Sequence, residues 1–307
     1  MARSISWTEN RKQQADKILE VVNDLNDYYP LTLRQVYYRL VAAQVIENKR
    51  SRYNDLSKVI KQMRLDKMLP WNVIEDRTRR VSVKRGYTDA GEYLKGKVDS
   101  MGYTGFSRCM VQGQEKYIEI WVEKDALSRV FEDVAWDYCL RCVTCKGYQS
   151  VSFIKAYQER AQKALDNKQE PVVLYFGDFD PSGVQMFEAA QNSLENDFGI
   201  HGVRYERVAL NLDDIRNYNL PNNPEAVKKT DRRYQAFVNR YGEYAVELDA
   251  LHPRELKNIA VEAVENEFDM ELAQQQVELG KKDFQTISTF QLKVKKYAED
   301  LLKEMNV

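Results

Sequence analysis

Two short apolar segments that each run directly into carboxylate residues restrict the fold of this chain more than any other feature. The first spans residues 117–122 and is followed by Glu123, and the second spans residues 171–176 and is followed by Asp178 and Asp180. Between the two segments, apolar residues recur with the spacing of an amphipathic helix. Strands that alternate with helices predict an α/β fold with a mainly parallel sheet covered by helices on both faces.

The rest of the apolar pattern extends this prediction along the chain. Further strands are expected to end at Lys146 and to span residues 203–209 and 245–248. Helices are expected after Ser150, which can cap one, and over residues 253–268 and 270–305. We interpret the last helix, which is rich in Gln, Lys and Glu, as a packing or dimerisation element. The predicted domains are residues 1–108, 109–252 and 253–307.

Glu123, Asp178 and Asp180 are candidate metal ligands. The carboxyl ends of parallel strands lie at one edge of the sheet, where such sheets bind ligands, and the two carboxylates of an extended D-x-D segment point to the same side. Three converging carboxylates repel one another unless a divalent cation lies among them, and hard oxygen ligands suit Mg²⁺. The alternative is a simple turn of Asp and Gly residues. Glu247 and Asp249 could extend the acidic cluster, but we favour a strand end and a helix cap for them.

Residues 1–108 show three helical patterns followed by a basic, β-prone segment. The helices are expected over residues 9–27, after the capping residue Thr32, and from a basic turn at residues 48–54 to Leu69. Three helices followed by a basic ribbon is the layout of a winged helix, whose third helix enters the major groove while the ribbon contacts phosphates. The side chains expected to contact DNA in this half are Lys58, Lys61, Arg64, Arg77, Arg79 and Arg80.

The net charge of −1 conceals a strong asymmetry. Residues 1–108 hold 21 basic and 13 acidic side chains, so they carry +8 and the remainder carries −9. A basic half joined to an acidic half is typical of a DNA-binding module attached to another domain, which predicts double-stranded DNA as the partner. There is no N-terminal export signal and no apolar run of about 18 residues, so we expect a cytoplasmic protein without a membrane partner. Within the cytoplasm it would be nucleoid-associated, or encoded by a virus or mobile element.

Three of the four cysteines lie close together in the sequence. Cys139, Cys142 and Cys145 form a C-x2-C-x2-C pattern, while Cys109 stands apart. The spacing allows a metal or cluster site, but no fourth ligand lies nearby. We therefore favour reduced, partly buried thiols.

Tyr38 stands out within the predicted second helix. Its neighbour Tyr37 belongs to the apolar stripe, whereas Tyr38 is turned about 100° away from that stripe and shares a face with Arg34. We therefore predict an exposed tyrosine beside an arginine. Such a guanidinium can bind phosphate oxygens and favour the phenolate, which would suit attack on a phosphate.

These motifs, taken in order, resemble a known family. Val122-Glu123-Lys124, Lys146-Gly147-Tyr148 and the segment from Asp178 to Gly183 resemble a Toprim domain. Upstream, Thr32-Leu33-Arg34-Gln35-Val36-Tyr37-Tyr38 resembles the nucleophile motif in the A subunit of type IIB DNA topoisomerases (topoisomerase VI), an architecture shared by the meiotic double-strand-break protein. The resemblance covers roughly residues 30–250. In length the chain is more similar to the compact, stand-alone A-subunit relatives of phages and mobile elements.

The resemblance implies that the chain cleaves DNA by transesterification. Tyr38 would attack a backbone phosphate and become linked to the 5′ end, Arg34 would stabilise charge on the phosphate, and Glu123, Asp178 and Asp180 would hold Mg²⁺. Gln35 stands where the family motif has Asp, and Lys146 matches a family loop with a possible phosphate contact.

The resemblance also implies partners. In the family, the tyrosine of one protomer and the Toprim domain of the other form each active site, so we expect a C2 homodimer. The chain has no P-loop, so an ATPase B-type subunit would have to be a separate protein. Two alternatives remain open, namely a Toprim nuclease that uses metal-activated water and a non-catalytic winged-helix DNA-binding protein.

Overall fold

The computed structural model describes residues 7–75, 89–101, 106–145, 150–223 and 233–305. The chain forms two compact units, the first built from residues 1–78 and 115–267 and the second from residues 79–114 and 268–307. Helix α10 (Pro253–Glu267), which the predicted boundaries place in the C-terminal extension, belongs to the first unit with the sheet. None of the helices in the described ranges has the length and apolar character to cross a membrane.

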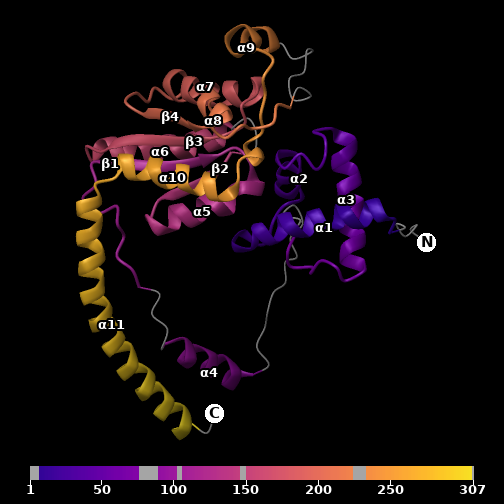
Figure 1. Ribbon diagram of the computed structural model, residues 1–307. Coiled ribbons are helices and arrows are strands. Elements are labelled where there is room, and N and C mark those ends of the chain that lie inside the picture. The colour runs from indigo at the N-terminus through magenta and orange to yellow at the C-terminus, as the bar shows by residue number, and fades with distance from the viewer. Residues whose placement is uncertain (1–6, 76–88, 102–105, 146–149, 224–232, 306–307) are drawn as a thin grey trace. The chain divides into compact units, whose positions relative to one another are not determined.

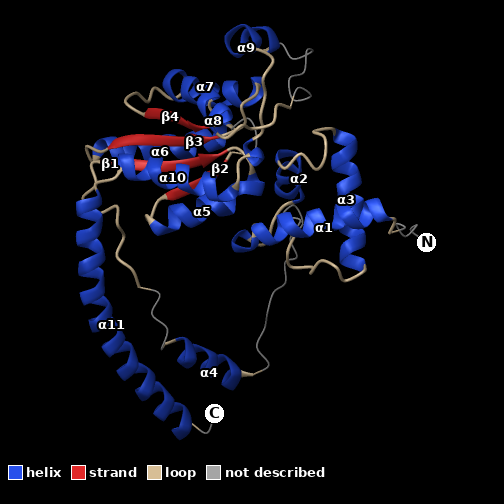
Figure 2. Cartoon of the chain, in the orientation of Figure 1, coloured by secondary structure: helices blue, strands red, loops and turns tan. Residues whose placement is uncertain are grey.

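The first unit contains a four-stranded sheet in which all paired strands are parallel (Figure 2). The strands are β1 (Lys116–Val122), β2 (Arg141–Thr144), β3 (Glu170–Phe176) and β4 (Arg204–Ala209), in the order β2-β1-β3-β4. The sheet confirms the predicted α/β class. The strand predicted over residues 245–248 is wrong, because this segment forms only an isolated bridge between Val246 and Phe179 and then the 3₁₀ turn η4 (Leu248–Ala250).

Helices cover both faces of the sheet (Figure 1). Trp121 and Tyr175 point to one face, where they join a buried cluster with side chains of α6 (Val151–Asp166) and α7 (Pro181–Asn196). Phe176 points the other way, because side chains alternate along a strand. Its ring packs 4.5 Å from that of Phe131 in α5 (Ser128–Asp137), and α10 lies beside α5. The two central strands, β1 and β3, are therefore buried over most of their length.

The front of the chain forms the three expected helices, α1 (Glu9–Asp24), α2 (Leu33–Ala42) and α3 (Arg50–Leu65). Helix α3 begins at Arg50, so residues 50–54 of the predicted basic turn already belong to the helix. It ends at Leu65, four residues early, because Lys67 adopts a positive φ of 61° and the Met68 amide returns to the Met63 carbonyl. Ile74 forms a bridge with Leu31. The basic ribbon predicted beyond it lies outside the described residues.

The second unit is helical. It contains α4 (Ala90–Ser100) and α11 (Met270–Glu304), which contact each other. Helix α11 confirms the predicted C-terminal helix. Arg108 ties the unit together, because its Nε atom lies 2.7 Å from Oδ2 of Asp283 and its Nη1 atom 3.1 Å from Oε1 of Gln276. Two shorter helices, α8 (Leu212–Asn217) and α9 (Tyr234–Tyr241), belong to the first unit.

Candidate active site at the carboxyl ends of the strands

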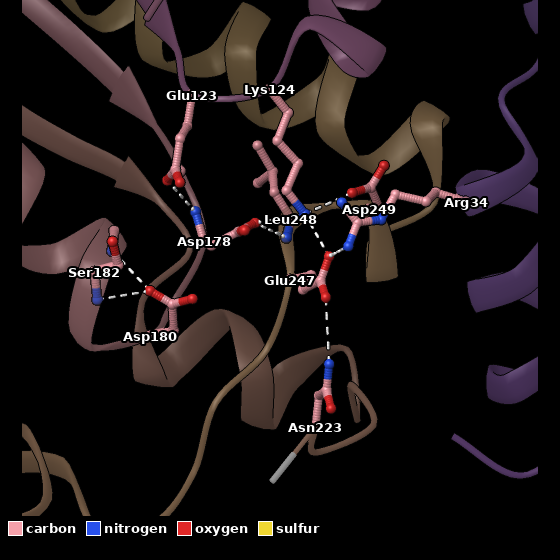
Figure 3. Close-up of polar contacts among 12 residues, drawn as sticks. Arg34, Glu123, Lys124, Asp178, Asp180, Ser182, Asn223, Glu247, Leu248 and Asp249 are labelled. Carbon is pink, nitrogen blue, oxygen red and sulfur yellow. Dashed lines mark hydrogen bonds and ion pairs between the residues drawn. The ribbon is translucent and has the colours of Figure 1, made fainter. Parts of the chain in front are cut away.

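Glu123 and Asp178 meet because they follow neighbouring strands (Figure 3). Glu123 comes directly after β1 and Asp178 lies two residues beyond β3. The Oε2 atom of Glu123 accepts hydrogen bonds from the Asp178 amide at 2.9 Å and from the Tyr175 hydroxyl at 3.2 Å. The structure therefore brings two of the three predicted ligands into direct contact.

Asp180 lies beside them but its carboxylate has a structural task. As the N-cap of α7, its Oδ1 atom accepts hydrogen bonds from the amides of Ser182 at 2.8 Å and Gly183 at 2.7 Å. The turn interpretation is thus correct for this one oxygen. The negative charges of Asp180 and Glu123 still act on Asp178, whose pKa is raised to about 7 by burial and by these neighbours, against the opposing effect of Lys124.

The donor set of Glu123, Asp178 and Asp180 suits a hard dication. No group of three acidic, His or Cys side chains in the described ranges is drawn together as ligands of a metal would be. One oxygen of each of these three carboxylates accepts a hydrogen bond from a backbone amide. Burial followed by the charge of Asp180 raises the pKa of Glu123, so the buried carboxylates repel each other. Bound Mg²⁺ would relieve that repulsion through the remaining oxygens.

Glycines make the approach of these carboxylates possible. A Cβ atom on Gly183 would lie 2.4 Å from the carbonyl oxygen of Asp178 and 3.0 Å from Oε2 of Glu123. A Cβ atom on Gly177 would lie 2.7 Å from the same Glu123 oxygen. The loop after β3 therefore needs glycine at both positions for steric reasons.

Lys124 is the centre of the cluster and was not predicted as a site residue. Its Nζ atom lies 2.9 Å from Oδ1 of Asp178, 2.7 Å from Oε2 of Glu247 and 2.7 Å from Oδ2 of Asp249 (Figure 3). Burial lowers the pKa of Lys124, but the three carboxylates outweigh burial and raise its pKa well above the ordinary value. Glu247 and Asp249 thus extend the acidic cluster, contrary to the strand end and helix cap favoured for them.

Arg34 and Tyr38 of α2 reach the same cluster through Glu247. The Nη2 atom of Arg34 lies 2.6 Å from Oε2 of Glu247, and the Tyr38 side chain lies near the same carboxylate. The prediction that Tyr38 is exposed is wrong, because only 3% of the residue is accessible. Its face points away from the three-helix core, as expected, but the turn η4 covers that face.

Arg34 lowers the pKa of Tyr38, as predicted, but other groups outweigh its effect. Burial, followed by the charge and hydrogen bond of Glu247, raises the pKa of Tyr38 far above its ordinary value, and Lys124 and Arg34 offset this only in part. Tyr38 therefore keeps its proton in this arrangement.

The predicted DNA-contacting residues have different surroundings. Lys58 and Lys61 are exposed on α3, as the helical pattern predicts. Arg64 is instead engaged within the chain, because it donates to the carbonyls of Trp71 and Ile74 and its guanidinium lies 5.2 Å from the Trp71 ring centroid. The other four predicted contacts, Arg77, Arg79, Arg80 and Lys146, lie outside the described residues.

Gln35 has a structural role at the start of α2, and the cysteines show no sign of a metal or catalytic role in the described residues. Gln35 completes a capping box at the start of α2. Its side-chain Oε1 atom accepts a hydrogen bond from the Thr32 backbone amide at 2.7 Å, and the Gln35 backbone amide donates to the Thr32 hydroxyl. Cys109, Cys139 and Cys142 are half-buried and Cys145 is buried, which agrees with the partial burial expected of these thiols. Burial, followed by the charge of Glu132, raises the pKa of Cys142 to about 12, which is characteristic of an unreactive thiol.

No protein-family model matches the chain, and no curated protein matches it. The functional argument therefore depends on the residues and geometry described above.

Proposed function

We propose that this protein cleaves double-stranded DNA in a Mg²⁺-dependent transesterification that uses Tyr38, in the manner of topoisomerase VI A subunits. The observation that carries the proposal is that one compact unit holds Tyr38 and Arg34 together on α2 and Glu123, Asp178 and Asp180 at the carboxyl edge of the sheet. A tyrosine and an arginine from a helical module and three acidic residues from a parallel sheet supply the groups that phosphoryl transfer to tyrosine requires.

In this reaction the Tyr38 oxygen forms a bond to phosphorus while the bond from phosphorus to the 3′ oxygen breaks. The tyrosine loses its proton, the 3′ oxygen gains one, and the DNA is left with a free 3′ hydroxyl and a 5′ phosphotyrosyl link. Arg34 binds the phosphate oxygens and offsets their charge in the transition state. Mg²⁺, when held by Glu123, Asp178 and Asp180, supplies positive charge at the same phosphate.

DNA binding is assigned to the N-terminal helices. We interpret α1–α3 as part of a winged helix whose α3 presents Lys58 and Lys61 to the major groove. The family resemblance suggests a homodimer with composite sites, and an ATPase B-type subunit if the protein also passes DNA strands.

The decisive experiment compares Tyr38→Phe with Tyr37→Phe. Tyr37 is the adjacent residue, is also buried, and donates to Asn48 rather than to the acidic cluster, so it is a matched control. Supercoiled DNA is incubated with protein and Mg²⁺, and denaturing gels of 3′-labelled products report protein attached to 5′ ends. We expect wild type and Tyr37→Phe to form the adduct, and Tyr38→Phe to form none.

Two other outcomes identify the alternatives. Cleavage that survives Tyr38→Phe but is lost in Asp178→Ala would indicate a nuclease that uses metal-activated water. DNA binding without cleavage in any variant, wild type included, would indicate a non-catalytic DNA-binding protein.

A further inference from the structure

The tyrosine assigned to attack DNA is not available to DNA in this structure. Tyr38 is 3% exposed and lies near Glu247 of the same chain, a carboxylate that is bound by Arg34 and Lys124. Phosphorus must come within bonding distance of the hydroxyl oxygen for transesterification. A duplex therefore cannot reach Tyr38 while α2 contacts the turn η4.

Several polar interactions contribute to the contact between α2 and η4. Besides the pair of Arg34 and Glu247, the Nη2 atom of Arg39 donates to the Ala250 carbonyl at 2.5 Å. After α2, the Nδ2 atom of Asn48 donates to the Asn222 carbonyl at 3.1 Å. We refer to these interactions together as the α2–η4 contact.

Hydrogen bonding within the α2–η4 contact is also incomplete. The Nε atom of Arg39 and the Oδ1 atom of Asp249 are buried there without a hydrogen-bond partner. Buried polar atoms without partners cost free energy that water would recover on separation. By contrast, the opposite face of α2 buries Val36 and Leu40 fully in the three-helix core. Helices α1, α2 and α3 can therefore separate from η4 as a group more easily than they can separate from one another.

The proton also stays on the tyrosine in this contact. Burial raises the pKa of Glu247, but Lys124 and Arg34 outweigh it and hold its pKa below the ordinary value, while that of Tyr38 is raised. Glu247 is therefore a poor base for Tyr38, and its negative charge keeps the nucleophile protonated rather than activating it.

We propose that the α2–η4 contact keeps Tyr38 buried inside its own chain, with Glu247 as the positioning residue that Arg34 of α2 binds, and that this contact must open before DNA is cleaved. This inference rests on the proposed function, because the held tyrosine is the nucleophile of that reaction. Opening would expose Tyr38 and Arg34 together, since both are carried by α2.

The first test needs no DNA and compares Glu247→Gln with Glu243→Gln. Glu243 accepts a hydrogen bond from Tyr234, so its variant removes another tyrosine–carboxylate pair from the same segment. Folded protein is nitrated with tetranitromethane, and the modified tyrosines are located by peptide mass spectrometry. We expect Tyr38 to be protected in wild type and in Glu243→Gln, and to react severalfold faster in Glu247→Gln.

Two tyrosines calibrate that measurement. Tyr93 is 42% exposed and should react in every variant, whereas the buried Tyr37 should stay protected. The proposal is overturned if Tyr38 of wild type reacts as fast as Tyr93, or if the rate at Tyr38 is unchanged in folded Glu247→Gln. Equal exposure of Tyr37 and Tyr38 would mean that α2 has unfolded in this variant, and the test then passes to the variant below.

A second variant covers the case in which Glu247→Gln does not fold. Arg39→Gln weakens the α2–η4 contact at the Ala250 carbonyl without altering the partners of Tyr38. It should also raise the nitration of Tyr38, and an unchanged rate would contradict the proposal.

The adduct assay then distinguishes a positioning role of Glu247 from a role in the cleavage reaction. If Glu247 only holds Tyr38, Glu247→Gln forms the covalent adduct at least as fast as wild type. Loss of the adduct in folded Glu247→Gln, with Tyr38 accessible, would overturn the proposal by showing that Glu247 takes part in cleavage. Cleavage that survives Tyr38→Phe would refute the proposed function instead, while the nitration result would still report whether Tyr38 is held.

Discussion

Lys124 and Asp178 form a buried ion pair at the carboxyl edge of the sheet. The Nζ atom lies 2.9 Å from Oδ1, and the two side chains are 12% and 10% exposed. Asp178 is assigned to Mg²⁺, so the cluster contains a resident positive charge next to the predicted metal site. Because Lys124 also binds Glu247, it connects that site to the helix that carries Tyr38.

Removing the Lys124 ammonium should strongly destabilise the first unit. Lys124→Met would leave Asp178, Glu247 and Asp249 buried without their shared cation, and such unpaired buried charges cost about 3–5 kcal/mol. Urea unfolding followed by circular dichroism measures the loss. Lys155→Met is the control, because Lys155 is 51% exposed and its pairing with Glu159 is at the surface. Equal midpoints for the two variants would contradict the prediction.

Gly183→Ala should disrupt the site through sterics alone. The new Cβ atom would lie 2.4 Å from a backbone oxygen of Asp178, so the loop has to move and Glu123 loses its position. We expect lower stability and no DNA cleavage, measured by thermal melting and the adduct assay. Gly96→Ala in α4 meets no atom within 4 Å and should instead stabilise its helix by about 0.5–1 kcal/mol. A fully active Gly183→Ala would show that the loop is not constrained as described.

The parts of this fold that depend on local pattern were predictable from the sequence. Thr32 and Ser150 cap helices as expected, because capping depends on a side chain and amides three residues away. The strand-end positions of Glu123 and Asp178 follow from the alternation of strands and helices, which forces parallel pairing.

The rest depends on contacts between segments far apart in the chain, which no local pattern reports. The helical face of Tyr38 was predicted correctly, but its burial depends on a turn near residue 249. Likewise, the role of Glu247 becomes visible only when Lys124 and Arg34 are placed beside it. A lysine directly after a strand-end glutamate was the one signal in the sequence that could have indicated a partner for these acids.

Lys58 and Lys61 should contribute to DNA affinity through phosphate contacts. Each contact changes the slope of log K against log salt by about 0.9, so Lys58→Ala with Lys61→Ala should reduce the slope by about 2. Fluorescence anisotropy at several salt concentrations measures it. Lys12→Ala with Lys17→Ala removes the same charge from α1 and serves as the control. If both double variants change the slope equally, net charge rather than α3 governs binding.

Asp180→Asn separates the metal role of this residue from its role as a helix cap. Asparagine caps helices about as well as aspartate, so α7 should still begin at Pro181 while one negative charge is lost. Mg²⁺ at about one hundred times its Kd should stabilise wild type by about 2.7 kcal/mol, because the ion binds only the folded state. The shift in melting temperature with Mg²⁺, followed by circular dichroism, should be much smaller in Asp180→Asn. Asp197→Asn at the other end of α7 is the control and should respond as wild type does. If Asp180→Asn responds to Mg²⁺ as strongly as the control, Asp180 is only a cap and the ion is held elsewhere.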